Sequence, residues 1–349
     1  MSIYRRVKGR GTGSNPSSRF HKEQYETDFS DFGWVEEDDL PNIKTEYFTD
    51  HSRTILAKND SPDIGFDTSI NPYRGCEHGC SYCYARPTHE YLGLYAGFDF
   101  ESKIFVKRQA PMLLRSELMK KKWRPQVIAM SGVTDCYQLG ERKFELTRGC
   151  LSVLAEFKNP VVLITKNHLI CRDADILSEL ARDNLVRVCL SVTSLDANLI
   201  KKLEPRSSAP MARLKAIEYL SKAGISVSVN VAPVIPGLTD QEIPSILRAS
   251  AEAGAKSAGM TLVRLPYSVK DHFADWLERH FPERKNRVLH TIQGMRAGKL
   301  NNSEFGARMR GNGKRALQIT ETFKIFRRKY ALNQKLPALR TDFDVQVTN

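Results

Sequence analysis

The chain has 349 residues, of which 41% are hydrophobic, which is enough to bury one large core without requiring a second substantial domain. No apolar run approaches the roughly 20 residues that span a bilayer, and the first residues lack the apolar stretch of a secretion signal. The sequence therefore predicts neither a membrane protein nor a secreted one, and favours the cytoplasm. The formal net charge of +13 argues for an anionic partner, and the seven cysteines suit a reducing compartment in which thiolates stay free for metal.

The N-terminal part is predicted to be an extension with an uneven charge. Its first 22 residues contain no acidic side chain, whereas the stretch up to Asp50 is acidic and includes Glu36–Asp39. The basic residues of this leader are Arg5, Arg6, Lys8, Arg10, Arg19 and Lys22. Such a segment is expected to be partly disordered. The predicted organisation is an N-terminal extension (1–58), a core domain (59–265) and a helical C-terminal extension (266–349).

Three cysteines lie within eight residues, in the run Cys76-Glu77-His78-Gly79-Cys80-Ser81-Tyr82-Cys83. Spacings of four and three residues fit a loop around a four-iron cluster, in which three thiols hold three corners and one iron stays open. Gly75 and Gly79 allow the close backbone approach that cluster sulfurs favour. A zinc site made only of cysteines usually needs two pairs, and no second Cys-x-x-Cys occurs, so zinc is the weaker interpretation. His78 and His89 could each replace a thiolate as an iron ligand. Because three thiols already suffice for the cluster, a supporting role is expected for both histidines.

After the cysteine loop, β-rich runs alternate with helical stretches, which is typical of a parallel sheet with crossover helices. The predicted strands are 126–130, 161–164, 186–190, 225–231 and 259–263, with a first strand just before Cys76. The predicted helices are 143–157, 173–182, 211–223 and 241–253. Six parallel strands with right-handed crossovers make an α/β fold of the partial (β/α)6, TIM-type barrel class.

The carboxyl ends of these predicted strands are polar. Chemistry in barrels of parallel strands collects at this end. The residues that follow the strands are Ser131–Asp135, Thr165–Asn167, Ser191–Thr193 and Ala232–Pro233. The repetition predicts a polar mouth at one end of the barrel.

The C-terminal extension mixes basic and aromatic residues between Lys299 and Lys335. The aromatic residues are Phe305, Phe323, Phe326 and Tyr330, and the basic ones include Arg308, Arg310, Lys314, Arg315, Lys324, Arg327, Arg328 and Lys329. Such a mixture could grip the backbone of DNA or RNA and stack a base. An amphipathic helix with its aromatics in the core and its charges in solvent explains the pattern equally well.

The cysteine loop resembles the signature of the radical S-adenosylmethionine (SAM) superfamily, Cys-x-x-x-Cys-x-aromatic-Cys, with Tyr82 as the aromatic residue. Within that superfamily, roughly residues 65–265 are similar to the spore photoproduct lyase group. The likeness rests on Cys76–Tyr84, Thr134-Asp135, Ile164–Lys166, Ser191, Glu204–Arg206 and Val231–Pro233. It is greatest to a branch of that group with a Lys8–Gly11 leader, a Ser131–Asp135 loop and a Phe305–Met309 tail, for which the resemblance supplies no substrate.

The resemblance implies a [4Fe-4S] cluster bound by Cys76, Cys80 and Cys83, and SAM bound beside it. Tyr82 would lie over the adenine, Thr134 and Asp135 would hold the ammonium group, and Ala232 would contact the nucleoside. Lys166 and Ser191 would hold the carboxylate. Arg206 is a further carboxylate candidate, although an ion pair with Glu204 is as good an expectation.

The resemblance also implies a hydrogen-donating cysteine just before the Thr-Asp pair, where this chain has Gly132-Val133. Cys136 follows the pair instead. It could serve as the hydrogen donor in the same cavity, or be an ordinary buried thiol, which is the more common state of free cysteine. This departure counts against repair of thymine dimers.

The expected function is that of a radical SAM enzyme. Its cluster would cleave SAM reductively to a 5′-deoxyadenosyl radical, which abstracts hydrogen from a substrate, with a nucleic-acid base as the leading candidate. A reductant such as flavodoxin or ferredoxin would supply the electron. Two alternatives are a radical SAM enzyme acting on a peptide or small metabolite, and a non-catalytic iron–sulfur protein that binds nucleic acid and senses redox state.

Overall fold

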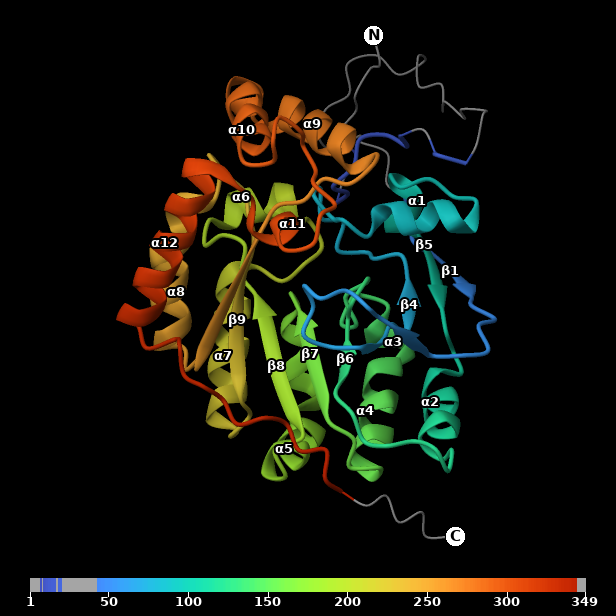
Figure 1. Ribbon diagram of the computed structural model, residues 1–349. Coiled ribbons are helices and arrows are strands. Elements are labelled where there is room, and N and C mark those ends of the chain that lie inside the picture. The colour runs from blue at the N-terminus through green and yellow to red at the C-terminus, as the bar shows by residue number, and fades with distance from the viewer. Residues whose placement is uncertain (1–6, 8, 17, 21–42, 344–349) are drawn as a thin grey trace.

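A sheet of parallel strands lies at the centre of the molecule (Figure 1). The computed structural model describes residues 7, 9–16, 18–20 and 43–343. Within these residues the sheet has 7 strands in the order β10-β9-β8-β7-β6-β3-β2. Every neighbouring pair is parallel except β2 and β3, which are antiparallel. The strands are β2 (Leu56–Lys58), β3 (Thr68–Ile70), β6 (Ile128–Met130), β7 (Val161–Thr165), β8 (Val186–Ser191), β9 (Val227–Val234) and β10 (Ser257–Leu262).

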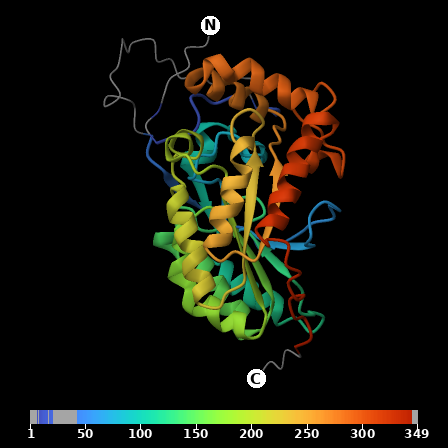
Figure 2. The same cartoon turned by 90° about the vertical axis from the view of Figure 1, so that its left-hand side faces the viewer.

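Helices join successive strands and cover one face of this sheet. Figure 2 shows the green and yellow helices together on one side of the strands. The helices between the strands are α2 (Ala110–Leu118), α3 (Glu141–Phe144), α4 (Leu146–Glu156), α5 (Ala174–Arg182), α6 (Ala197–Leu203), α7 (Pro210–Lys222) and α8 (Ile243–Glu252). A parallel pair needs such a crossover, because the chain must return to the same end of the sheet.

Side-chain alternation explains which face carries the core. In β9, Val227, Val229 and Val231 are buried in the main apolar cluster together with the leucines and isoleucines of α7 and α8. Their neighbours Ser228 and Asn230 point to the other face, since successive side chains of a strand alternate. Burial of each valine stabilises the fold by about 1.5–3 kcal/mol. The apolar face therefore anchors the helices and leaves the other face for polar groups.

The predicted fold class is confirmed. All five numbered strand predictions overlap observed strands, and β3 is the expected first strand before Cys76. The two edge strands of the seven-stranded sheet, β10 and β2, do not pair with each other among the described residues, so the barrel is partial. The antiparallel edge strand β2 was not predicted. It is three residues long and mostly exposed, so it has almost no alternating pattern.

A smaller sheet carries the chain into the cysteine loop. Its order is β1 (Glu46–Thr49), β5 (Lys103–Val106) and β4 (Tyr73–Arg74), and helix α1 (Phe98–Ser102) leads into β5. The described part of the basic leader packs beside this unit, with Arg10 and Thr12 buried. Arg5, Arg6, Lys8, Lys22 and Glu36–Asp39 lie outside the described residues, so the partial disorder expected for the extension stays a prediction.

The C-terminal extension consists of α9 (Val269–His280), α10 (Pro282–Gly294), α11 (Ala307–Arg310) and α12 (Gly313–Lys329). Helix α12 packs beside α8, and α9 and α10 lie above the carboxyl ends of the strands (Figures 1 and 2). None of the described helices is both long and apolar enough to cross a bilayer. The proposed boundaries at 58/59 and 265/266 stay predictions.

Candidate active site

The cysteine loop begins directly after β4. Gly75 and Gly79 adopt φ values of 80° and 64°, a left-handed backbone that glycine adopts at low cost. All three cysteines of the loop are free thiols, with Cys76 and Cys80 buried and Cys83 partly buried. They border one cavity of about 350 Å³ at the carboxyl ends of the central strands. The three thiols of the loop therefore border a single cavity.

Buried polar residues brace this loop. Arg86 is fully buried and donates two hydrogen bonds to the carbonyl oxygen of Cys80, at 3.0 and 2.9 Å, and its guanidinium pairs with Glu101. Gln138 accepts a bond from the Glu77 amide at 2.9 Å and donates one to the Gly75 carbonyl at 3.1 Å. Because these bonds are shielded from water, they fix the loop backbone on both sides of the cysteines.

The thiols fit an iron–sulfur cluster by their chemistry. Burial, followed by the charge of neighbouring groups, raises the pKa of both Cys76 and Cys80, and burial also raises the pKa of Cys83. Three buried thiolates beside one another need a cationic partner, which iron would supply. The described residues contain no trio of His, Cys, Asp or Glu side chains close enough to hold a single ion. The three thiols border the shared cavity instead.

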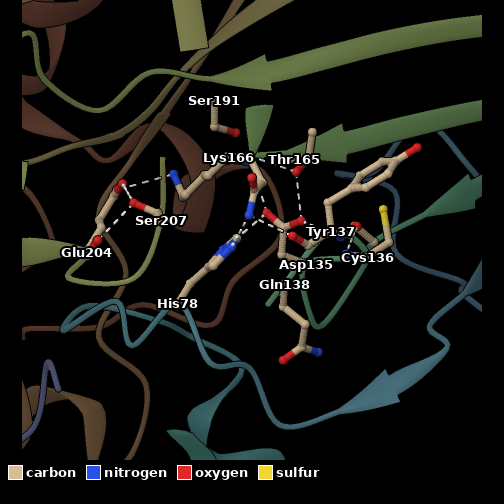
Figure 3. Close-up of polar contacts among 12 residues, drawn as sticks. His78, Asp135, Cys136, Tyr137, Gln138, Thr165, Lys166, Ser191, Glu204 and Ser207 are labelled. Atoms are coloured by element: carbon tan, nitrogen blue, oxygen red, sulfur yellow. Dashed lines mark hydrogen bonds and ion pairs between the residues drawn. The ribbon is translucent and has the colours of Figure 1, made fainter. Parts of the chain in front are cut away.

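Asp135 lies on the cavity wall with its carboxylate fully engaged (Figure 3). It accepts bonds from the Thr165 hydroxyl at 2.7 Å and from the Lys166 amide at 2.8 Å, and His78 Nδ1 lies 3.4 Å away. Burial alone would raise the pKa of Asp135, but His78 and these hydrogen bonds together hold it below its usual value. Thr134 also borders the cavity, and its hydroxyl donates to the Tyr73 carbonyl at 3.0 Å. An ammonium group at this position would meet a carboxylate that these neighbours orient and whose pKa they hold low.

Lys166 and Tyr82 both reach a buried glutamate. Lys166 Nζ lies 3.4 Å from Glu204 Oε1 and donates to the Ala232 carbonyl at 2.9 Å. The Tyr82 hydroxyl donates to the same carboxylate, and the buried guanidinium of Arg213 pairs with its other oxygen. Burial alone would raise the pKa of Glu204, but Arg213 and Lys166 outweigh it and keep the group ionised. Glu204 thus positions both Lys166 and Tyr82 at the cavity.

Ser191 and Asn230 add uncommitted polar groups to the wall. They are register partners on β8 and β9, and both border the cavity. Within the described part of the chain, neither side chain has a hydrogen-bond partner. Ala232 follows two residues after Asn230 on the same face and also borders the cavity.

Two predicted site residues lie away from the cavity. Arg206 donates to the Gly9 carbonyl at 2.9 Å and to Thr45 Oγ1 at 3.3 Å, and so it holds the leader rather than Glu204. Cys136 is completely buried in the main apolar core. Its sulfur lies on the opposite side of Asp135 from Lys166 (Figure 3). The cavity wall thus includes the three cysteines, Tyr82, Thr134, Asp135, Lys166, Ser191 and Ala232, but neither Arg206 nor Cys136.

Sequence reasoning missed several residues of the cavity wall. Asn230 had a usable signal, because it alternates with the buried valines of β9. His78 was expected in a supporting role without a named partner, and it is buried between Asp135 and Asn167. Glu204 does not border the cavity itself, but it supports Tyr82 and Lys166 from behind, and no local pattern reveals this role. Tyr84 and Arg264 also border the cavity and carried no signal of their own.

A partial barrel of parallel strands, with a three-cysteine loop at the strand ends, defines an α/β protein in which three free thiols border a ligand-sized cavity. Residues 70–249 match the model of the radical SAM superfamily, which is more than half of the chain. The chain therefore belongs to the radical SAM superfamily.

Two uncharacterized proteins are similar to this chain over half of its length or more. An uncharacterized protein of Mycobacterium tuberculosis is 37% identical over 226 residues, covering 64% of this chain. The match spans just under two thirds, 66%, of the mycobacterial protein's own length. An uncharacterized protein of Methanocaldococcus jannaschii is 32% identical over 173 residues, covering 50% of this chain and 62% of that protein.

Solved structures of spore photoproduct lyase share the fold. A mutant of that enzyme with bound AdoMet and dinucleoside spore photoproduct superposes with a TM-score of 0.59, covering 81% of this chain and 78% of the lyase. Another mutant gives a TM-score of 0.60 over 84% of this chain and 86% of the lyase. Sequence identity is 16% in both cases, so the likeness concerns the fold.

Proposed function

We propose that this protein is a radical SAM enzyme that acts on a base of DNA or RNA. The observation that carries the proposal is the shared cavity, which collects three free thiols and six of the residues expected to bind SAM. Its volume of about 350 Å³ lies in the range of small-molecule sites. A [4Fe-4S] cluster held by Cys76, Cys80 and Cys83, together with SAM, would supply reductive cleavage to methionine and a 5′-deoxyadenosyl radical that abstracts hydrogen.

The chain's own residues would bind and orient the cofactor. Asp135 offers an ionised carboxylate to the ammonium group, and the Lys166 ammonium and Ser191 hydroxyl lie on neighbouring strands for the carboxylate. Glu204 Oε1 lies 3.4 Å from Lys166 Nζ and accepts a hydrogen bond from the Tyr82 hydroxyl, so it holds both side chains at the cavity wall. The apolar wall made by Ile164, Leu262 and Val263 would exclude water from a reactive radical.

The nucleic-acid substrate is supported by three observations. The chain carries a net charge of +13, its C-terminal extension is strongly basic, and the fold is shared with a lyase that binds a dinucleoside spore photoproduct. Fewer aromatic side chains of the extension are free to stack on a base than its composition predicts. Phe323 is buried, and Phe326 and Tyr330 pack against the main core, which leaves Phe305 exposed at 59%. We place the protein in the cytoplasm, with a flavodoxin or ferredoxin as electron donor.

The test is an anaerobic turnover assay. The purified protein is reconstituted with iron and sulfide, reduced, and given SAM, and 5′-deoxyadenosine is measured by chromatography. We expect product from the wild type and none from a Cys76→Ala, Cys80→Ala, Cys83→Ala variant. The buried Cys136→Ala variant is expected to retain product formation, because Cys136 does not border the cavity.

Each alternative has its own outcome. A full, reducible cluster without product, with and without nucleic acid, would indicate a non-catalytic iron–sulfur protein. Product that forms with peptide or metabolite fractions and not with DNA or RNA would indicate the other class of radical enzyme.

A further inference from the structure

Arg264 is a cation on the cavity wall that no described residue pairs with. It follows β10, at the edge of the central sheet, and borders the cavity that the three cysteines also border. Among the described residues, none accepts a hydrogen bond from its guanidinium or forms an ion pair with it. A half-buried guanidinium without an acceptor leaves its strong donors unused.

Two neighbouring arginines, in contrast, are anchored. Arg308 Nε pairs with Asp63 Oδ2 at 2.6 Å, and its Nη2 donates to the Ser61 hydroxyl. Arg296 is buried and donates to the Val263 carbonyl at 2.5 Å and to the Arg308 carbonyl at 3.0 Å. The fold therefore gives these two guanidiniums hydrogen-bond acceptors, whereas that of Arg264 borders the cavity without an acceptor among the described residues.

An aromatic ring holds the Arg264 guanidinium in place. Its Cζ lies 4.9 Å from the centroid of the Tyr84 ring. The Tyr84 hydroxyl donates to the Gly132 carbonyl at 2.6 Å, so the ring is fixed. A cation over an aromatic face is stabilised while its N–H edges stay free for a further partner.

The local charge balance favours an anion. The pKa of Arg264 is lowered by burial and by the charge of Arg308, while Tyr84 and Asp63 oppose this. Burial, and then the charge of Arg264, lowers the pKa of Arg296 to about 10. The negative charge of Asp63 acts on Arg264, but Asp63 already forms an ion pair with Arg308. A bound anion would relieve the excess positive charge.

We propose that Arg264 binds a phosphodiester group of the substrate, next to the nucleotide that enters the cavity. This inference rests on the proposed function and names the group by which the substrate is recognised. A guanidinium fork matches the oxygens of phosphate. Segment 305–311 supports the choice of a nucleic acid, because it places Met309 in the cavity wall and leaves Phe305 exposed. Arg308 Cζ lies 4.5 Å from the centroid of the Phe305 ring. Phe305 offers a stacking surface for a neighbouring base.

The experiment measures binding of a fluorescein-labelled single-stranded oligonucleotide of about ten nucleotides by anisotropy, on the anaerobically reconstituted protein. An oligonucleotide of the same sequence with uncharged methylphosphonate linkages is the second probe. Arg264→Gln is compared with Arg310→Gln, which removes the same charge from an exposed residue of α11 outside the cavity. Circular dichroism and iron content verify that both variants fold and hold the cluster.

We expect Arg264→Gln to raise the Kd for the phosphodiester probe about tenfold, as loss of a charged hydrogen bond predicts. The slope of log Kd against log salt should fall by about one. Arg310→Gln should change the affinity much less, and the methylphosphonate probe should bind both variants equally. Binding of radiolabelled SAM should be unchanged in both.

Several results would overturn the inference. Equal losses in the two variants would indicate general electrostatic attraction, and unchanged affinity of Arg264→Gln would remove its role. Loss of SAM binding instead would assign Arg264 to the carboxylate of the cofactor. Failure of the proposed function is a separate result, since absence of 5′-deoxyadenosine from the wild type leaves the oligonucleotide measurement readable.

Discussion

At the residue scale, Glu204 connects the predicted cofactor site to the core. Its carboxylate meets the Tyr82 hydroxyl, the Thr193 hydroxyl at 2.6 Å, Lys166 and the buried Arg213. Arg213 in turn donates to the Ser191 carbonyl at 3.0 Å. One buried charge therefore orients side chains from the cysteine loop and from two strands of the sheet. This explains why these positions stay aligned before any ligand binds.

The substitution Glu204→Gln should lower the free energy of unfolding by about 3 kcal/mol, because it leaves the buried guanidinium of Arg213 without its counter-charge. Urea denaturation measures the change. The matched control is Glu218→Gln, which breaks an exposed ion pair with Lys222 and should change the stability little. Similar losses in both variants would show that Glu204 is not a central structural charge.

At the element scale, the N-terminal leader is packed against the cysteine loop. The Gly11 amide donates to Glu101 Oε2 at 3.0 Å, and Glu101 also pairs with Arg86, which holds Cys80. A Cβ atom on Gly11 would lie 1.7 Å from the Gly79 carbonyl oxygen. The absence of a side chain at this position is what allows the two segments to touch.

Gly11→Ala should therefore displace the leader and loosen the loop. We expect a loss of roughly 2 kcal/mol in the free energy of unfolding, from broken buried hydrogen bonds, and a lower iron content after reconstitution. The control is Gly294→Ala at the end of α10, where a Cβ meets nothing within 4 Å, and it should change stability by less than about 1 kcal/mol. Full iron loading of Gly11→Ala would contradict a supporting role for the leader.

Helix α12 provides a second test at this scale. Phe323 is 7% exposed and packs in the main core, whereas Phe305 is 59% exposed. Phe323→Ala should cost about 3 kcal/mol of stability, and Phe305→Ala less than about 0.5 kcal/mol. Thermal denaturation measures both. Oligonucleotide affinity should respond in the reverse order, and a loss of affinity confined to Phe323→Ala would assign the stacking surface to α12.

At the scale of the whole molecule, the carboxyl ends of the strands are where distant segments meet. The cysteine loop, the strand ends and segment 305–311 all border one cavity. The leader reaches α9 from the other end of the sequence, where Thr12 Oγ1 lies 3.1 Å from His272 Nδ1. The N-terminal and C-terminal extensions therefore both lie at the end of the sheet where the cavity is.

Buried histidines should make the stability of the whole fold sensitive to acid. Burial lowers the pKa of His89 to about 4 and that of His272 well below its ordinary value of 6.5. The unfolded chain then binds more protons than the folded one between pH 6.5 and 4, so stability is full above pH 6.5 and falls as the pH drops through this window. His89 alone should account for about 3 kcal/mol.

Chemical denaturation over a pH series tests this expectation, with iron content measured at each pH. His89→Gln keeps a donor for the Lys103 carbonyl, which His89 Nε2 contacts at 2.9 Å. It should reduce the slope of the free energy of unfolding against pH by an amount that corresponds to at most one bound proton. His290→Gln, at an exposed histidine of α10, is the matched control. Equal effects of the two substitutions would contradict the assignment to His89.

The sequence by itself determined the features that are written locally. Short β-rich runs between helical stretches predicted the parallel strands, and the spacing of Cys76, Cys80 and Cys83 predicted a loop that presents three thiols to one space. Polar residues after each strand predicted the composition of the mouth, because parallel strands bring their carboxyl ends to one edge. These patterns need only a few consecutive residues, so tertiary contacts did not change them.

Only the tertiary structure decided which distant residues meet. Tyr82 and Glu204 are 122 positions apart, Gly11 and Glu101 are 90 apart, and Arg308 reaches Asp63 across 245. The periodicity of apolar residues in the sequence predicts which side chains face inward, but it does not predict which partners they contact there. Arg206 was expected near the cofactor and instead holds the leader, while the unpaired Arg264 carried no local signal. Charge pairing between segments depends on the packed fold, since it is the fold that removes these groups from water.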